Sequence, residues 1–296
     1  MLILMLAAVL VVIPAVAAAA PCGGHGDGGS MVVTTNWLAA HQNDPNLLVL
    51  AVGEKSEYGR AHIPGSVYLD YHDMSAQGGF TLELPPMPEL AETFGKLGVT
   101  DDSRVVLYTI GNGSTQTARV YLTLDAMGLG ARTSILDGGL AIWQGEARSV
   151  TTEVPDVKPG RITPCPQTDV IASLDYVRVN LQHAGIDIVD ARDPQYYTGA
   201  SASRNRAGHI AGAASIPYSS LLDEKGKLKS AEVLQQQFRA AGVKTGDQIV
   251  AYCHIGQQAS LLYFVSRYLG YDVRLFDGSW EEWARHPELP VELVQK

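Results

Sequence analysis

The sequence predicts an α/β protein of two tandem domains, each a mainly parallel sheet flanked by helices. Short apolar runs that resemble buried strands, such as 47–52 and 186–191, alternate with segments of helical periodicity. Several landmarks of the first half also recur in the same order 140 to 147 residues later. The length of 296 residues suits two domains.

Four pairs of landmarks carry the internal repeat. They are a His-Ile-x-Gly turn, a strand with a tyrosine near its end, an Asp-Gly turn and a tryptophan. The paired positions are His62 and His209, Tyr108 and Tyr252, Asp137 and Asp277, and Trp143 and Trp283. A nearly constant offset over four ordered landmarks indicates a duplicated unit.

Composition divides the rest of the chain. Residues 1–20 are apolar, uncharged and end in small residues, which predicts a secretory signal peptide, with an uncleaved membrane anchor as the alternative. The glycine-rich segment 21–30 is expected to be a flexible tether, and the proline-rich segment 151–167 a linker. The first domain is therefore expected over 31–150 and the second over 168–296.

Charge and cysteine content exclude several functions. A net charge of −9 argues against nucleic acid as a partner and repels anions at long range, so an anionic substrate needs a local site. Three cysteines without a Cys-x-x-Cys pair predict neither a disulfide framework nor a metal centre.

The leader also predicts a location. With a cleaved signal peptide we expect a periplasmic or secreted protein without stable membrane association. Disulfides persist in such a compartment, so Cys22 and Cys165 could pair there, although no spacing requires it. The sequence does not fix the oligomeric state.

Cys253 is the candidate nucleophile. It directly follows the strand-like run 249–252 and precedes a short loop, 254–258, that opens a helical segment. Backbone N–H groups of such a turn converge on the sulfur, which is expected to stabilise the thiolate and lower its pKa. An inert buried cysteine is the alternative. The first half carries Thr109 at this position and so lacks a nucleophile.

Four motifs of the second half occur in order: a Val-Asp-Ala-Arg run that ends at Arg192, an Arg-Ala-Gly-His run from Arg206, the loop 253–258 and an Asp-Gly-Ser-Trp run from Asp277. With these motifs the chain resembles the two-domain rhodanese family of thiosulfate and 3-mercaptopyruvate sulfurtransferases. The resemblance covers about 31–293. The fold that it implies is two rhodanese-like α/β domains, of which the N-terminal one is catalytically silent.

The resemblance also implies a reaction. Cys253 would take a sulfane sulfur from a small anionic donor such as thiosulfate and pass it, as a persulfide, to a thiol or cyanide, without a cofactor. The silence of the first half agrees with Thr109 and with Leu50 and Val52, which we expect to stand where the second half has Asp190 and Arg192.

Several residues are expected to bind the donor. Arg192 is the expected anion clamp, with an ion pair to Asp190 as the alternative. Many family members carry a second arginine four residues later, where this chain has Tyr196. Arg204 and Arg206 are the candidates to supply that charge, with a purely surface position of either as the alternative. The further candidates are a histidine expected to be partly charged near neutral pH, other loop residues and a tryptophan that walls the cleft: His254, Ile255, Gly256, Gln257, Gln258 and Trp280.

Other functions stay open. One is a 3-mercaptopyruvate sulfurtransferase, and another is a carrier or sensor that holds a persulfide without turnover. A phosphatase of the related cell-cycle type is disfavoured, because its Cys-x5-Arg loop requires an arginine where this chain has Ala259.

Overall fold

The structure is a computed structural model that describes residues 29–76 and 78–294. The predicted signal peptide, nearly all of the predicted tether and Cys22 lie outside the described residues.

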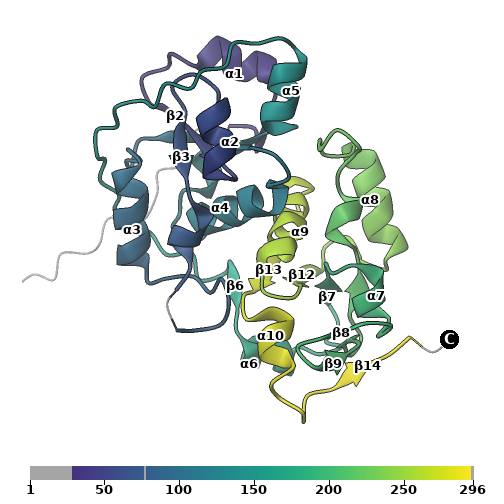
Figure 1. The fold of residues 1–296 in the computed structure, drawn as a ribbon. Helices are drawn as coiled ribbons and strands as arrows, with labels where there is room; N and C mark the ends of the chain where they lie inside the picture. The colour runs from purple at the N-terminus through teal and green to yellow at the C-terminus, as the bar shows by residue number, and fades with distance from the viewer. Residues whose placement is uncertain (1–28, 77, 295–296) are drawn as a thin grey trace, which may run out of the picture.

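The first half is built on a five-stranded sheet in the order β1-β5-β4-β2-β3, with every pair parallel (Figure 1). Alternate residues of β2 enter two separate apolar clusters, so both faces of the sheet are covered. The strands are β1 (Val32–Val33), β2 (Leu47–Val52), β3 (Val67–Leu69), β4 (Arg104–Thr109) and β5 (Thr133–Leu136).

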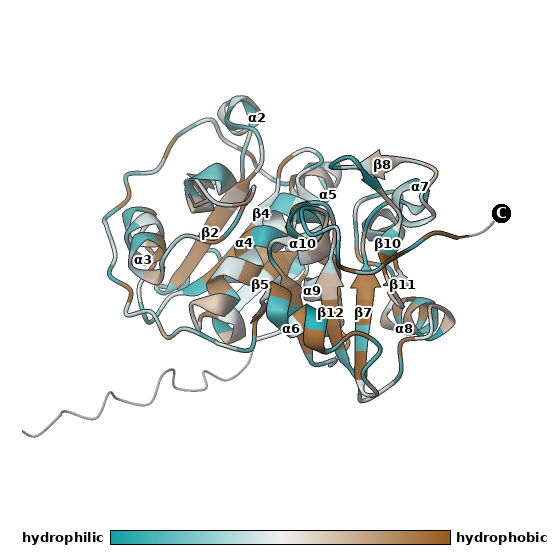
Figure 2. Ribbon diagram, turned by 90° about the horizontal axis from the view of Figure 1, so that it is seen from below, coloured by the Kyte–Doolittle hydropathy of each residue, from teal (hydrophilic) through white to brown (hydrophobic). Residues whose placement is uncertain are grey.

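The second half repeats this sheet, strand for strand, in the order β6-β13-β12-β7-β11. Its strands are β6 (Ile171–Ala172), β7 (Ile186–Asp190), β11 (Ala214–Ser215), β12 (Gln248–Tyr252) and β13 (Val273–Phe276). Figure 2 shows the apolar strands β2, β7 and β12 enclosed between helices. The prediction of two tandem α/β domains is therefore confirmed.

The helices follow the same plan. The first half contains α1 (Thr35–His41), α2 (Lys55–Arg60), the 3₁₀ turn η1 (Tyr71–Met74), α3 (Met87–Lys96), α4 (Ser114–Ala126), η2 (Gly130–Arg132) and α5 (Gly139–Gly145). The second contains α6 (Leu174–Val179), α7 (Pro194–Tyr197), η3 (Tyr218–Ser220), α8 (Ala231–Ala240), α9 (Gln257–Tyr268) and α10 (Ser279–Trp283). None of the helices in the described ranges is long and apolar enough to cross a bilayer.

The two halves meet along α4 and α9, which lie side by side (Figure 1). Tyr121 and Phe264 meet there edge to face with ring centroids 4.7 Å apart, within an apolar cluster that draws on both halves. Asp125 of α4 accepts a 2.7 Å hydrogen bond from the hydroxyl of Tyr263 and lies 3.6 Å from Arg267, both on α9. The interface therefore combines apolar packing with a buried hydrogen bond and a partly exposed ion pair.

Residues 152–167, within the predicted linker, contain no helix or strand and lie along the first half. The Gly160 N–H donates to the carbonyl of Gly95, and the Cys165 N–H to that of Met127. Two short antiparallel pairs complete the second half: β8 (Ala202–Ser203) with β9 (Arg206–Ala207), and β10 (His209–Ile210) with β14 (Val291–Glu292).

The strand register corrects the predicted counterparts of Asp190 and Arg192 in the first half. Tyr252 lies opposite Asp190, whereas its counterpart Tyr108 lies opposite Ala51. Ala51, not Leu50, is therefore the counterpart of Asp190, and two residues further on Gly53, not Val52, is the counterpart of Arg192. The prediction was one residue out of register because the apolar run of the first strand offers no landmark against which to align it.

Candidate active site

Cys253 lies at the carboxyl end of β12 and is buried. The turn that opens α10 holds its backbone on both sides: the Cys253 N–H donates to Ser279 Oγ at 3.2 Å, and the Trp280 N–H donates to the Cys253 carbonyl at 3.0 Å. The Glu281 N–H binds the carbonyl of His254 in the same way, at 3.0 Å. The start of α10 therefore fixes the backbone of residues 253–258, which we call the cysteine turn.

Backbone N–H groups surround the sulfur of Cys253, as the strand–turn–helix pattern predicts. We call these four groups the sulfur cradle; they belong to Ile255, Gly256, Gln258 and Ala259. Each lowers the pKa of the thiol, yet burial has the larger effect and raises it above the ordinary value. The prediction of a lowered pKa was therefore wrong, because sequence shows the donors but not how completely the sulfur is removed from water.

The loop conformation depends on Gly256. This residue is the N-cap of α9 and has φ of 84°, a left-handed conformation that glycine adopts without strain. It lets the chain turn back over the sulfur before the helix begins. Next to it, Gln257 Nε2 donates to Thr115 Oγ1 of the first half at 3.2 Å, and Gln258 Oε1 is buried without a partner in the described part of the chain.

His254 is neutral, contrary to the prediction of partial charge. Burial lowers its pKa to about 4, and Arg192 acts in the same direction. Its Nδ1 is 2.7 Å from Ser203 Oγ, and its ring meets that of Tyr196 edge to face at 4.5 Å. Tyr196, at the position where many relatives carry arginine, therefore packs on the cysteine turn.

Arg192 is fully buried and ion-paired with Asp190, with Nη2 and Oδ2 2.5 Å apart. Tyr252 donates to the same carboxylate at 2.8 Å, and the Arg192 guanidinium lies 4.3 Å from the centroid of the Trp280 ring. Nη1 of Arg192 has no hydrogen-bond partner in the described part of the chain. The structure thus shows the predicted alternative, an ion pair, and leaves the two N–H bonds of the buried Nη1 available.

Two predicted site residues have structural positions instead. The guanidinium of Arg206 donates from Nη1 to the carbonyl of His286 at 2.9 Å and from Nη2 to that of Leu289 at 2.6 Å, so both terminal nitrogens hold the C-terminal segment. Trp280 is fully buried behind Arg192, and its Nε1 donates to the carbonyl of Ser203. It supports the site from within rather than lining an open cleft.

The first half also contributes to the site, which the sequence did not indicate. Arg119 of α4 is buried and ion-paired with Asp277 at 2.6 Å, and it also donates to the carbonyl of Leu82. The backbone N–H of Leu84 binds the other carboxylate oxygen of Asp277 at 3.0 Å. The signal that could have indicated this role is an arginine followed directly by Val-Tyr-Leu in a helical segment, because a cation among apolar residues is seldom buried without a partner.

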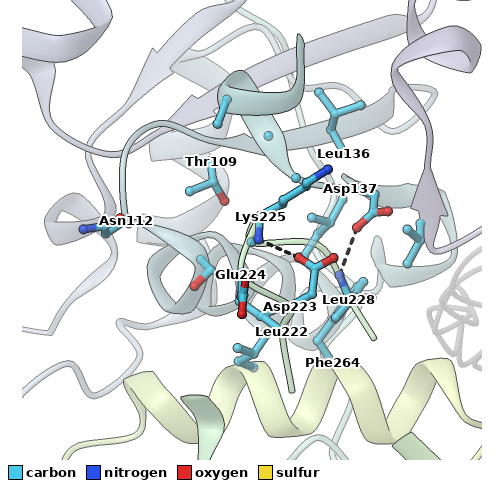
Figure 3. Close-up of a pocket in the computed structure, with 18 of the residues that line it drawn as sticks. Thr109, Asn112, Leu136, Asp137, Leu222, Asp223, Glu224, Lys225, Leu228 and Phe264 are labelled. Carbon is cyan, nitrogen blue, oxygen red and sulfur yellow. Dashed lines mark hydrogen bonds between the residues drawn. The ribbon is translucent and has the colours of Figure 1, made fainter. Parts of the chain in front are cut away.

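The counterpart of the cysteine turn in the first half lies at Thr109, whose hydroxyl pairs with that of Thr117 at 2.8 Å. A cavity of about 480 Å³ opens here, lined by Thr109, Asp137 and the loop 222–226 with Leu228 of the second half (Figure 3). Within the described ranges, no group of three or more His, Cys, Asp or Glu side chains could hold a metal ion.

Comparison with known proteins identifies the family. The model of the rhodanese-like domain matches twice, over residues 34–146 and 173–286. The chain therefore belongs to the rhodanese-like family, as a member with two such domains, and the predicted resemblance is confirmed.

Individual relatives are similar over nearly their whole length. The chain is 30% identical to a thiosulfate sulfurtransferase of Azotobacter vinelandii, over 89% of this chain and 97% of the relative. It is 32% identical to the sulfur carrier protein TtuD of Thermus thermophilus, over 88% and 96%. The crystal structure of SseA from Escherichia coli, described as a 3-mercaptopyruvate sulfotransferase, matches with a TM-score of 0.77 and 27% identity, over 85% and 99%. The sulfurtransferase class is thereby supported.

Proposed function

We propose that this protein transfers the sulfane sulfur of thiosulfate to a thiol or cyanide through a persulfide on Cys253. The observation that carries the proposal is the buried Cys253 at the end of β12, in a turn where the four backbone N–H groups of the sulfur cradle each lower the pKa of its thiol. Such a cradle stabilises a thiolate and, after transfer, a terminal persulfide sulfur.

The reaction has two balanced steps. The Cys253 thiolate attacks the outer sulfur of thiosulfate, a new S–S bond forms, and the S–S bond of thiosulfate breaks as sulfite leaves with the electron pair. An acceptor thiolate or cyanide then attacks the terminal sulfur of the persulfide. The product is a new persulfide or thiocyanate, and the Cys253 thiolate is restored. Two half-reactions predict ping-pong kinetics.

The charges of the site bear on the choice of donor. Asp190 neutralises Arg192, and His254 is uncharged at neutral pH. A donor anion would therefore be held by hydrogen bonds, from the buried Nη1 of Arg192 and the cradle, rather than by a free cation. Because thiosulfate carries two negative charges, this weak cationic field does not by itself select it over 3-mercaptopyruvate. The choice of thiosulfate is supported by the similarity to proteins named as thiosulfate sulfurtransferases.

The test is steady-state transfer to cyanide from each of the two donors, with the Cys253→Ser variant as control. We expect a higher kcat/KM with thiosulfate and a mass increase of one sulfur atom on the peptide that contains Cys253. Preferential turnover of 3-mercaptopyruvate would contradict the donor, and a sulfur adduct elsewhere would contradict the nucleophile.

A second candidate is a persulfide carrier without rapid turnover. The complete burial of Cys253 favours it, because a sulfur shielded from bulk thiols keeps its cargo until a partner opens the site. The similarity to a protein named as a sulfur carrier supports the same idea. Stoichiometric loading with slow release to cyanide would identify a carrier, whereas repeated turnover would identify an enzyme.

We also propose export of the chain, on the apolar and uncharged residues 1–20. Fractionation of the native host is the test. Processed protein in the periplasmic or extracellular fraction would support export, and full-length protein in the cytosol would contradict it.

A further inference from the structure

We propose that Arg119, in the domain without a nucleophile, is a positioning residue for the sulfur cradle of the other domain. The inference rests on the proposed function of Cys253 and extends it across the interface between the two halves. Its basis is the set of contacts around one buried guanidinium.

The first contact is with the turn that anchors the cysteine. Arg119 Nη1 lies 2.6 Å from Asp277 Oδ1, and both side chains are almost completely buried. Asp277 begins the turn whose next residues hold the cysteine: Ser279 Oγ accepts from the Cys253 N–H, and Trp280 donates to the Cys253 carbonyl. A shift of Asp277 is therefore transmitted to both peptide groups of Cys253.

The second contact is with the cradle itself. A Cβ atom placed on Gly256 would lie 3.1 Å from Arg119 Nη1 and 3.2 Å from the Asp277 carbonyl oxygen. The guanidinium thus packs directly on the residue that forms the left-handed turn of the cradle. One helical turn earlier on α4, Thr115 accepts a hydrogen bond from Gln257, so two residues on the same face of α4 contact the loop.

The third contact ties Arg119 to its own half. Nη2 donates to the carbonyl of Leu82, which has φ of 63°, and the N–H of Leu84 binds Asp277 Oδ2. The arginine therefore links α4, the loop around Leu82 and the Asp277 turn. A planar guanidinium can serve these two acceptors at once, which the single ammonium group of lysine does less well.

The internal repeat supplies a natural comparison. Arg119 lies nine residues before Gly128, and Leu261 of α9 lies nine residues before Gly270. Leu261 faces the Thr109 turn, where it lines the 480 Å³ cavity. The arginine thus occurs beneath the turn that bears the nucleophile, and an aliphatic side chain beneath the turn that does not.

The experiment measures alkylation of Cys253 by iodoacetamide against pH, read on the Cys253 peptide by mass spectrometry, together with kcat and KM. In Arg119→Met we expect the apparent pKa of the thiol to rise by about one unit, a tenfold loss of thiolate near neutral pH. We expect kcat to fall about tenfold with little change in KM, because the cradle acts on the reacting sulfur. Arg119→Lys should give intermediate values and, by keeping a buried cation, guards against misfolding of the methionine variant.

The matched control is Arg267→Met, which removes the ion pair that joins α9 to Asp125 of α4 and leaves the Arg119–Asp277 pair in place. Its alkylation profile should match that of the wild type. The proposal is overturned if the Arg119→Met profile coincides with the wild type, or if Arg267→Met shifts it equally. Alkylation needs no sulfur donor, so a wild-type protein that accepts no sulfur would refute the proposed function and leave this comparison valid.

Discussion

The cysteine turn of the second half and the threonine turn of the first half share one architecture and differ in what lies beneath them. Each turn is covered by a loop from the other half: the N–H of Leu84 binds Asp277, and the N–H of Leu228 binds Asp137, both at 3.0 Å. At the cysteine turn, the buried Arg119 completes these contacts. At the Thr109 turn, the counterpart of Arg119 is Leu261, which lines a cavity instead.

The strands next to the two turns also differ in their buried polar side chains. The second half buries Asp190, Arg192 and Tyr252 as one hydrogen-bonded group beside Cys253. The register places Ala51 and Gly53 at the positions of the first two, so the first half cannot form this group. Burying charged side chains is costly unless they are paired, and this buried Asp–Arg–Tyr group lies beside the turn that bears the nucleophile but has no counterpart beside the Thr109 turn. The comparison indicates that these polar groups serve the chemistry.

The largest effect should come from the nucleophile. Cys253→Ser is expected to reduce sulfur transfer by at least about a thousandfold, since both half-reactions pass through this sulfur. Thr109→Cys in that background should restore nothing, because the Thr109 turn lacks the arginine and the buried polar group. Steady-state assays of both variants, with thermal unfolding to show an intact fold, provide the measurement. Recovery of activity in the double variant would break the comparison.

The next effect concerns stability. Asp190→Asn removes the charge that neutralises the fully buried Arg192, and we expect a loss of about 3–5 kcal/mol in the free energy of unfolding. Ala51, the counterpart of Asp190, has no charge to remove, so the comparison in the first half is Asp137→Asn, which touches a partly exposed ion pair with Lys227 and should cost less than about 1 kcal/mol. Urea unfolding of both variants is the measurement. Equal losses would contradict the distinction between the halves.

Much of the fold and part of the site could be predicted from the sequence. The features that could not be predicted all depend on how segments that are distant in the sequence pack together. The repeat, the two sheets and Cys253 followed from local patterns, because strand periodicity and turn glycines are encoded over a few residues. Arg119 and the burial of Cys253 depend on how the two halves pack, which no local pattern records. The neutral state of His254 has the same origin, since burial between Ser203 and Tyr196 removes its charge.

That neutral histidine gives a smaller, pH-dependent effect. The pKa of His254 is about 4 in the folded protein, against 6.5 in an unfolded chain. Between these values the unfolded chain binds a proton that the folded chain does not, so stability should fall as the pH falls from 6.5 to 4. His254→Gln should remove this part of the slope. Unfolding free energies measured from pH 4 to 7.5 test it, and parallel curves for the two proteins would contradict the assignment.

The smallest effect on turnover should come from Thr109, in the turn of the first half that lacks a nucleophile. Thr109→Ala removes a hydroxyl that pairs with Thr117, which keeps a second acceptor in the carbonyl of Gly113 at 2.9 Å. No covalent step depends on Thr109, so kcat should stay within about twofold of the wild type. The control is Ser279→Ala, which removes the hydroxyl that binds the Cys253 N–H and should lower kcat more. A loss of a hundredfold in Thr109→Ala, without unfolding, would show that the first half takes part in the reaction through its own turn and not only through Arg119.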